Sequence, residues 1–281
     1  MPRMFIFGLG YTAQVIARHL QVRGWEVIST GREGTLTFDD EGTVRLALTD
    51  ADHVLSSVPP GNEARGEPLD PVLERYSDAL RGKALSYLSS TGVYGDAGGA
   101  WVDESSLIGA GRRTARCEAD AAWLALGARV YRLPGIYGPG RSMLDRVSAG
   151  RAHRIALPGQ VFSRIHVEDI AAGVLAGLNA PPGAYNLADD LPCHQNLVVE
   201  EACRLLGVDL PPLQSLDKAN LSAMALAFYA ENRRVANGKA KRMLGWRPRY
   251  PDYVAGLRAL RATISPIVAS TAPATVRGVQ R

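Results

Sequence analysis

A glycine-rich turn near the start of the chain constrains the fold more than any other feature. The apolar segment RMFIFG (3–8) is typical of a strand, and YTAQVIARHLQVRG (11–24) has the apolar spacing of a helix. Between them Gly8, Gly10 and Ala13 form the pattern G-x-G-x-x-[GA], which permits a tight turn, close approach of a pyrophosphate and close helix packing. The N–H groups that start such a helix favour phosphate. The pattern predicts a dinucleotide-binding turn made of Gly8, Gly10, Tyr11, Thr12 and Ala13.

Strand signals and helix signals alternate along the first half of the chain, which is typical of βαβ units and a parallel sheet. Helices are expected at 70–82 and 112–126 and, in the second half, at 142–150, 166–180, 195–207 and twice within 231–260. Strands are expected at WEVIST (25–30), HVLSSV (53–58), ALSYLSS (84–90), ARVYRL (128–133) and AYNLA (184–188). The sequence therefore predicts an α/β fold.

Composition excludes several classes of protein. With 281 residues and 46% hydrophobic content, the chain can bury a substantial core. The 32 basic and 28 acidic residues are intermixed, so we expect no nucleic-acid partner. Cys117, Cys193 and Cys203 have neither disulfide nor metal-site spacing. No apolar stretch is long enough to cross a membrane and no secretory signal is visible, so we expect a cytoplasmic protein without a metal site or a membrane partner.

The end of the second predicted strand bears on the type of cofactor. An Asp or Glu there would bind the ribose 2′-hydroxyl of NAD(H), but the chain reads VISTGREG (27–34). Arg32 suits the 2′-phosphate of NADP(H), because its planar fork matches phosphate oxygens. We therefore expect NADP(H), with NAD(H) as the second choice. The alternative is a solvated Arg32, with Glu33 reaching the ribose.

Five further motifs follow in a fixed order, and together with the glycine turn they resemble the extended short-chain dehydrogenases/reductases, the NAD-dependent epimerase/dehydratase family. The resemblance covers about residues 3–260. It rests on SSTGVYGD (89–96), WVDESS (101–106), RLPGIYGPGRS (132–142), RIHVEDIA (164–171) and AYNLADD (184–190).

The resemblance implies a Rossmann-type doubly wound parallel sheet with a smaller C-terminal substrate domain. We place the cofactor domain at 1–180 and the substrate domain at 181–264, with loop contributions from about 136–160. The remaining 265–281 are rich in Ala, Thr, Ser and Pro and are expected to be a flexible tail. The family's usual substrates are nucleotide-activated sugars or related carbonyl compounds.

The chain departs from the family at its catalytic pair. The family uses a Tyr-x-x-x-Lys pair at the start of a helix, and alignment places Arg112 and Arg116 there. No Tyr or Lys occurs from Trp101 to Val130, so the chain resembles the atypical branch that lacks the pair. An arginine cannot donate the proton, because it stays protonated. Arg116 could still hold the nicotinamide ribose, and Arg112 could bind an anionic substrate. The alternative is that Arg116 pairs with Asp120 and the other arginines are solvated.

Other residues match family positions. Ser90, four residues before Tyr94, would support catalysis, and Tyr94 or Tyr137 could replace the missing proton donor unless these rings only pack. Arg141 could meet a substrate phosphate or be a surface charge, and His166 could titrate or simply bond to the start of a helix. The remaining cofactor candidates are Ser57, Val58, Pro59, Ser89, Pro134 and Ile136, and the substrate candidates are Thr91, Arg112, Arg141 and His166.

Two functions remain open at this point. The first is an oxidoreductase or epimerase that acts on a nucleotide-sugar or a small carbonyl compound. The alternative is a non-catalytic NADP(H)-binding redox sensor, which the loss of Tyr and Lys favours. The family resemblance also suggests a homodimer, formed through the helices at 69–82 and 112–126.

Overall fold

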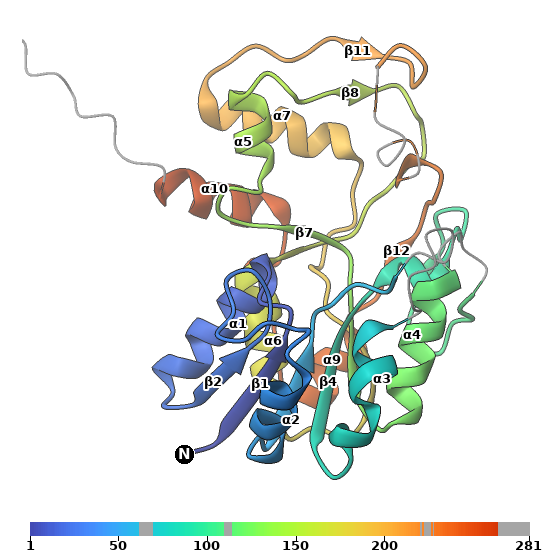
Figure 1. The fold of residues 1–281 in the computed structure, drawn as a ribbon. Helices are drawn as coiled ribbons and strands as arrows, with labels where there is room; N and C mark the ends of the chain where they lie inside the picture. Colours follow the sequence, from blue (N-terminus) through green and yellow to red (C-terminus); the bar gives the residue numbers. More distant parts are fainter. Residues whose placement is uncertain (62–69, 110–113, 220, 222–225, 227, 264–281) are drawn as a thin grey trace, which may run out of the picture.

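The computed structural model describes residues 1–61, 70–109, 114–219, 221, 226 and 228–263. A six-stranded parallel sheet forms the larger part of the molecule (Figure 1). All six strands fall on the segments expected from the sequence, so the α/β prediction is confirmed. Along the sheet the order is β10 (Gly183–Asn186), β6 (Arg129–Leu133), β4 (Ala84–Ser90), β3 (His53–Ser56), β1 (Arg3–Phe7) and β2 (Glu26–Ser29).

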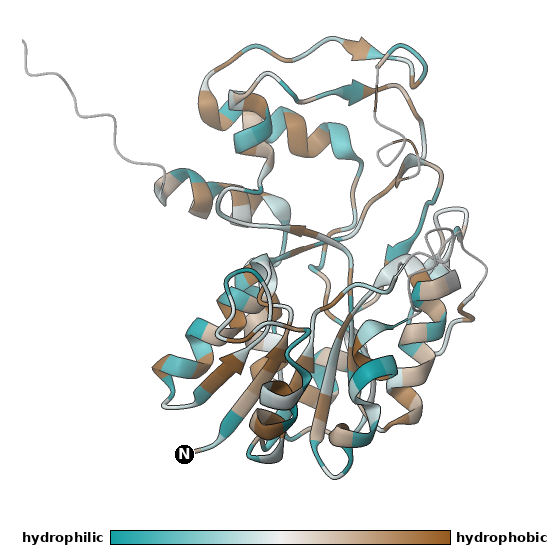
Figure 2. Cartoon of the chain, viewed as in Figure 1, coloured by the Kyte–Doolittle hydropathy of each residue, from teal (hydrophilic) through white to brown (hydrophobic). Residues whose placement is uncertain are grey.

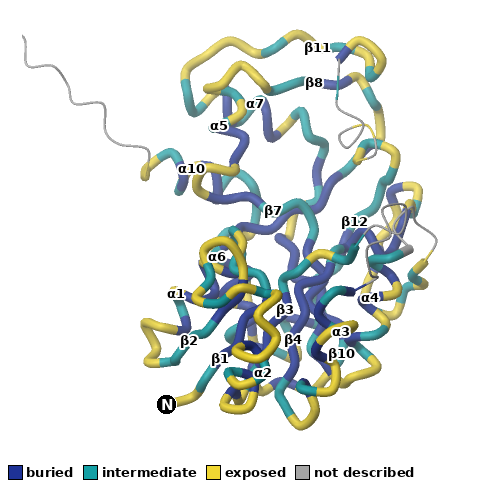
Figure 3. Tube along the Cα trace, viewed as in Figure 1, coloured by how far each residue is buried: buried dark blue, intermediate teal, exposed yellow. Residues whose placement is uncertain are grey.

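The alternation of side chains along β1 explains why helices cover both faces of this sheet. Met4 and Ile6 pack into one apolar cluster, whereas Phe5 and Phe7 pack into a second one. Figures 2 and 3 show the central strands as largely hydrophobic and buried. The sheet is therefore doubly wound, as expected. The first cluster takes in α1 (Tyr11–Val22), α6 (Val167–Ala176) and α9 (Gly238–Leu244); the second takes in α2 (Glu41–Thr49), α3 (Pro71–Tyr76) and α4 (Thr114–Ala125).

A smaller layer lies beyond the carboxyl ends of the six parallel strands (Figure 1). Leu144, Val198 and Leu257, from three different helices, meet in its own apolar cluster. Short parallel pairs complete this region and connect it to the sheet. Its elements are α5 (Met143–Ser148), α7 (Gln195–Leu206) and α10 (Tyr253–Thr263), with the pairs β8 (Arg154–Ile155)/β11 (Leu213–Gln214), β7 (Gly135–Tyr137)/β9 (Arg164–His166) and β5 (Trp101–Val102)/β12 (Arg234–Val235).

The boundary between the cofactor domain and the substrate domain at residues 180/181 stays a prediction. Two elements that follow it, a strand and a helix, belong to the large sheet and to the helices packed on it. β10 is the outer strand of the six, and α9 packs on the same face as α1. The expected tail, 265–281, lies outside the described residues. None of the helices in the described ranges is both long enough and apolar enough to span a membrane.

The segment before α9 differs from the expectation of a helix beginning near Glu231. Its backbone is extended, and Arg234–Val235 pairs with β5. The N–H of Asn232 donates to Asp96 at 2.8 Å, and that of Val235 donates to Ser163 at 2.9 Å. These partners satisfy the backbone without a helix, which begins only at Gly238.

A buried polar network joins α4 to the sheet. Arg132 on β6 forms a two-fold hydrogen-bonded ion pair with Asp120 on α4, with Nη2 2.7 Å from Oδ1 and Nε 3.1 Å from Oδ2. The two side chains are only 3% and 0% exposed. Ser89 donates to the same carboxylate at 2.6 Å. Such a pair is costly to break, because one partner alone would be a buried unpaired charge.

We therefore expect Asp120→Ala to lower the free energy of unfolding by about 3–5 kcal/mol, measured by urea denaturation. The matched control is Glu41→Ala, which removes the exposed pair between Glu41 and Arg45 on α2. That change should cost at most about 1 kcal/mol, since exposed pairs contribute little. Equal costs for the two variants would contradict this account of the network.

Candidate active site

The glycine turn is held by hydrogen bonds to residues that follow two neighbouring strands. Gly8 has a φ of +80°, and a Cβ there would lie 3.1 Å from Val58. Its N–H donates to the hydroxyl of Thr30 at 3.2 Å, and the N–H of Leu9 donates to the Thr30 carbonyl at 2.8 Å. Ser57 donates to the carbonyl of Gly8. The fold itself therefore requires a glycine at position 8.

Gly10 is different, because neither its backbone nor its surroundings require a glycine. Its φ is −84°, and no atom lies within 4 Å of where a Cβ would be. It occupies the N-cap of α1, where no side chain bonds to the first N–H groups. Ala13 is fully buried in the core, as its role in helix packing requires. Open space and unsatisfied donors at a helix start fit the phosphates of a dinucleotide.

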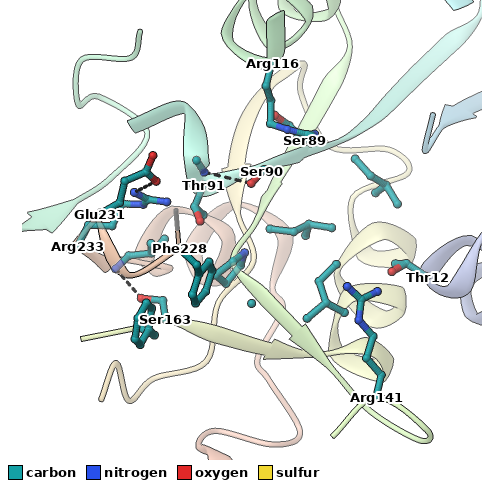
Figure 4. A pocket seen from close by; sticks show the side chains of 18 of the residues that line it. Thr12, Ser89, Ser90, Thr91, Arg116, Arg141, Ser163, Phe228, Glu231 and Arg233 are labelled. Carbon is teal, nitrogen blue, oxygen red and sulfur yellow. Dashed lines mark hydrogen bonds and ion pairs between the residues drawn. The ribbon is translucent and has the colours of Figure 1, made fainter. Parts of the chain in front are cut away.

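A cavity of about 410 Å³ extends from this turn along the end of the sheet (Figure 4). It is lined by the ends of β4 and β6, the start of α1, and α4. The structure thus brings together many of the side chains that the sequence analysis selected. These are Gly10, Tyr11, Thr12, Ser57, Ser89, Ser90, Thr91, Arg116, Pro134, Ile136 and Arg141.

Ser90 and Arg116 are the polar groups best placed for chemistry in this cavity. The Oγ of Ser90 accepts from the N–H of Gly92 at 3.1 Å, so its own hydrogen can be donated to a ligand. In Figure 4 the side chain of Arg116 extends from α4 toward Ser89. Arg112 and Arg113, for which an anion site was considered, lie outside the described residues.

Tyr11 links the glycine turn to the loop that carries Arg141. Its hydroxyl donates to the carbonyl of Pro139 at 3.1 Å, and the Arg141 guanidinium lies 5.6 Å from the centre of its ring. A Cβ on Gly138 would lie 2.5 Å from the same hydroxyl. The glycine at 138 therefore lets the tyrosine lie beneath this loop.

Arg32 and the loop after β3 lie beside the turn rather than in the cavity. Gly31 has a φ of +122°, and a Cβ there would lie 3.0 Å from the N of Leu9. This contact fixes the end of β2 against the turn and leaves Arg32 and Glu33 exposed just beyond it. Both alternatives for the ribose therefore remain. Val58 and Pro59 follow Ser57 and do not line the described cavity.

Tyr94, considered as a replacement for the missing proton donor, is buried outside the first cavity. It is 3% exposed, and its hydroxyl donates to Asn186 at 2.7 Å and accepts from Arg132 at 3.0 Å. Burial raises the pKa of this phenol. The ring belongs to the network between α4 and the sheet and does not line the first cavity, so a catalytic role for Tyr94 stays a prediction.

Tyr137 and His166 lie together, away from the first cavity. Their rings form an edge-to-face contact with centroids 5.1 Å apart. The Nδ1 of His166 accepts from the N–H of Glu168 and caps α6, and burial lowers its pKa to about 4. The structural alternative considered for this histidine is thus the observed one. Tyr137 lines a second cavity, and burial raises the pKa of its hydroxyl.

Among the residues that line the first cavity, the sequence analysis did not select Phe228, Glu231 or Arg233. Glu231 and Arg233 form an ion pair of 2.8 Å and, with Phe228, face Thr91 across the cavity (Figure 4). Glu231 is the one carboxylate among the described lining residues. No local signal marked these side chains: Glu231 and Arg233 come from the segment that was expected to begin a helix, and Phe228 precedes it.

Comparisons with known proteins agree with this architecture, although no protein-family model matches the chain. A 3-diazoavenalumate denitrifying reductase from a Streptomyces species is 30% identical over 158 residues, which are 52% of this chain and 51% of the relative. The chain thus matches about half the length of this curated relative.

Two solved structures match over nearly their whole length. The human epimerase family protein SDR39U1 with NADPH has a TM-score of 0.77 at 18% identity, covering 93% of this chain and 100% of the other. A functionally unknown conserved protein from Silicibacter pomeroyi has a TM-score of 0.80 at 40% identity, covering 93% and 99%. The chain therefore belongs to one family with the Silicibacter pomeroyi protein, and its fold is that of the extended short-chain dehydrogenases/reductases of the NAD-dependent epimerase/dehydratase type.

Proposed function

We propose that the protein is an NADP(H)-dependent oxidoreductase or epimerase that acts on a carbonyl compound or its alcohol. The observation that carries this proposal is Gly10. It stands at the start of α1, beside unsatisfied N–H groups and a cavity, although neither its backbone conformation nor its packing requires a glycine there. This arrangement is what a pyrophosphate requires. The human structure with NADPH and the Streptomyces reductase support the same assignment.

Each part of the cavity and its surroundings then has a role in binding. The first turn of α1 would hold the pyrophosphate, Arg32 the 2′-phosphate, and Arg116 the nicotinamide ribose in place of the family's lysine. When bound, the nicotinamide supplies or accepts hydride. Ser90 would donate a hydrogen bond to the reacting oxygen. Glu231, held by Arg233, is the carboxylate positioned to exchange a proton on the substrate side.

The shape of the site favours an enzyme over a redox sensor. The first cavity adjoins a second one of about 630 Å³, and both are lined by Gly135, Ile136, Arg141, Phe162, Ser163 and Phe228. A sensor that reads only the cofactor has less need of a second cavity on the nicotinamide side. We further propose a small-molecule substrate and retain the homodimer through the helices at 69–82 and 112–126 as a prediction.

The first test replaces Gly10 by Ser. Serine is a favourable N-cap residue, so the free energy of unfolding should stay equal or rise by a few tenths of a kcal/mol. The same side chain would fill the space that the pyrophosphate needs, so NADPH affinity should fall at least ten-fold. Chemical denaturation and a fluorescence titration with NADPH measure the two effects. An unchanged affinity would overturn the assignment of this turn.

The second test compares Arg32→Ala with Glu33→Gln in titrations with NADPH, NADH and NADP⁺. If Arg32 binds the 2′-phosphate, its loss should lower the affinity for NADPH about ten-fold or more and leave the affinity for NADH nearly unchanged. Glu33→Gln should alter neither. If Glu33→Gln lowers the affinity for NADH while Arg32→Ala changes no cofactor affinity, the result would show that Glu33 binds the ribose. A wild-type protein that prefers one redox form of NADP ten-fold would favour the sensor.

A further inference from the structure

The second cavity has one strongly charged side. Arg141, Arg146 and Arg151 line it, and His153 stands near them. Across the described part of the chain, no carboxylate forms an ion pair with any of these three arginines. All three are exposed to solvent, and an anionic ligand in the cavity would be attracted by their charges.

The cavity's own acid does not neutralise this charge. Asp145 is its one carboxylate among the described lining residues. It accepts from the N–H of Ser142 at 2.7 Å and from the hydroxyl of the same residue at 2.6 Å, and so closes the capping box of α5. Its charge is therefore engaged at the start of that helix.

Much of the remaining lining is apolar. Phe162 and Phe228 stack with centroids 4.6 Å apart and planes within 7°. These two rings also line the first cavity, so a group lying on them reaches the nicotinamide side. The further apolar lining comes from Met143, Val198, Leu257 and the rings of Tyr229 and Tyr253.

Several of the cavity's neutral polar groups already accept a hydrogen bond within the protein. The hydroxyl of Ser163 accepts from Val235, and the amide oxygen of Gln195 accepts from Arg164 at 2.7 Å. Ser142 is engaged at the cap of α5. The arginines are the strongest hydrogen-bond donors in the lining, and an anionic group is the ligand that they favour.

From this arrangement we infer that the second cavity binds a small organic acid, with its carboxylate on the Arg141, Arg146 and Arg151 side and an aromatic or other apolar body against Phe162 and Phe228. The inference rests on the proposed function and narrows it. It selects a small carbonyl compound with an anionic end as the substrate class and disfavours the nucleotide-sugars that are usual for this fold. The reacting carbon would lie where the two cavities meet, near Ile136 and Ser163.

The test uses 3-phenylpropionate as an unreactive probe, titrated calorimetrically into the protein with and without NADP⁺. The neutral 3-phenylpropionamide tests the need for charge, acetate tests the need for the apolar body, and UDP-glucose is added as a competitor. We expect the acid to bind at least ten-fold more tightly than the amide or acetate, with no competition from UDP-glucose. Equal binding of acid and amide, no binding of the acid, or displacement by UDP-glucose would overturn the inference.

Variants separate this site from the cofactor site. Arg146→Gln and Arg151→Gln should each lower the affinity for 3-phenylpropionate about ten-fold without changing the affinity for NADPH. The matched control is Arg81→Gln, which changes an exposed arginine outside both cavities and should alter neither affinity. An equal loss of 3-phenylpropionate binding in all three variants would argue against the arginine cluster. If the wild type binds the acid but no NADPH, the proposed function fails while the acid site stands.

Discussion

The close approach of three backbones at the glycine turn determines where the whole site lies. The carbonyl of Gly8 accepts from Ser57 after β3, and its N–H is bonded to Thr30 after β2. A side chain on Gly8 would meet Val58, and one on Gly31 would meet the N of Leu9. Because these contacts leave little room for movement, the start of α1 is fixed at the end of the sheet. The ends of β4 and β6 then face the same space, because all six strands are parallel.

Much of this architecture could be predicted because its signals are local. Each strand of the sheet is a short apolar run bounded by turn residues, and the glycine pattern spans only six positions. Ser90, Arg116 and Pro134 could be selected for the cavity because their motifs resemble those of the family, and all three line it. The helix α2 was not expected from the sequence.

The failures have a common physical cause, which is that the partner of a side chain lies far away in the sequence. Tyr94 bonds to Asn186, 92 residues away, and that contact holds its ring in the buried network beside α4. Glu231 and Arg233 reach the cavity because their segment pairs with β5 instead of forming a helix. Their composition resembles that of the helix that follows. Long-range pairing of this kind leaves no trace in local spacing.

The bond between Tyr11 and Pro139 has a consequence for how the two halves of the site communicate. Tyr11 stands in the turn that would hold the pyrophosphate, and Pro139 stands in the loop that carries Arg141 into the second cavity. Because there is no spare space between Gly138 and the hydroxyl of Tyr11, that loop cannot shift without moving the Tyr11 side chain beneath it. A ligand that displaces the loop on one side therefore changes the free energy of binding on the other. By thermodynamic reciprocity, each ligand alters the affinity for its neighbour by the same factor.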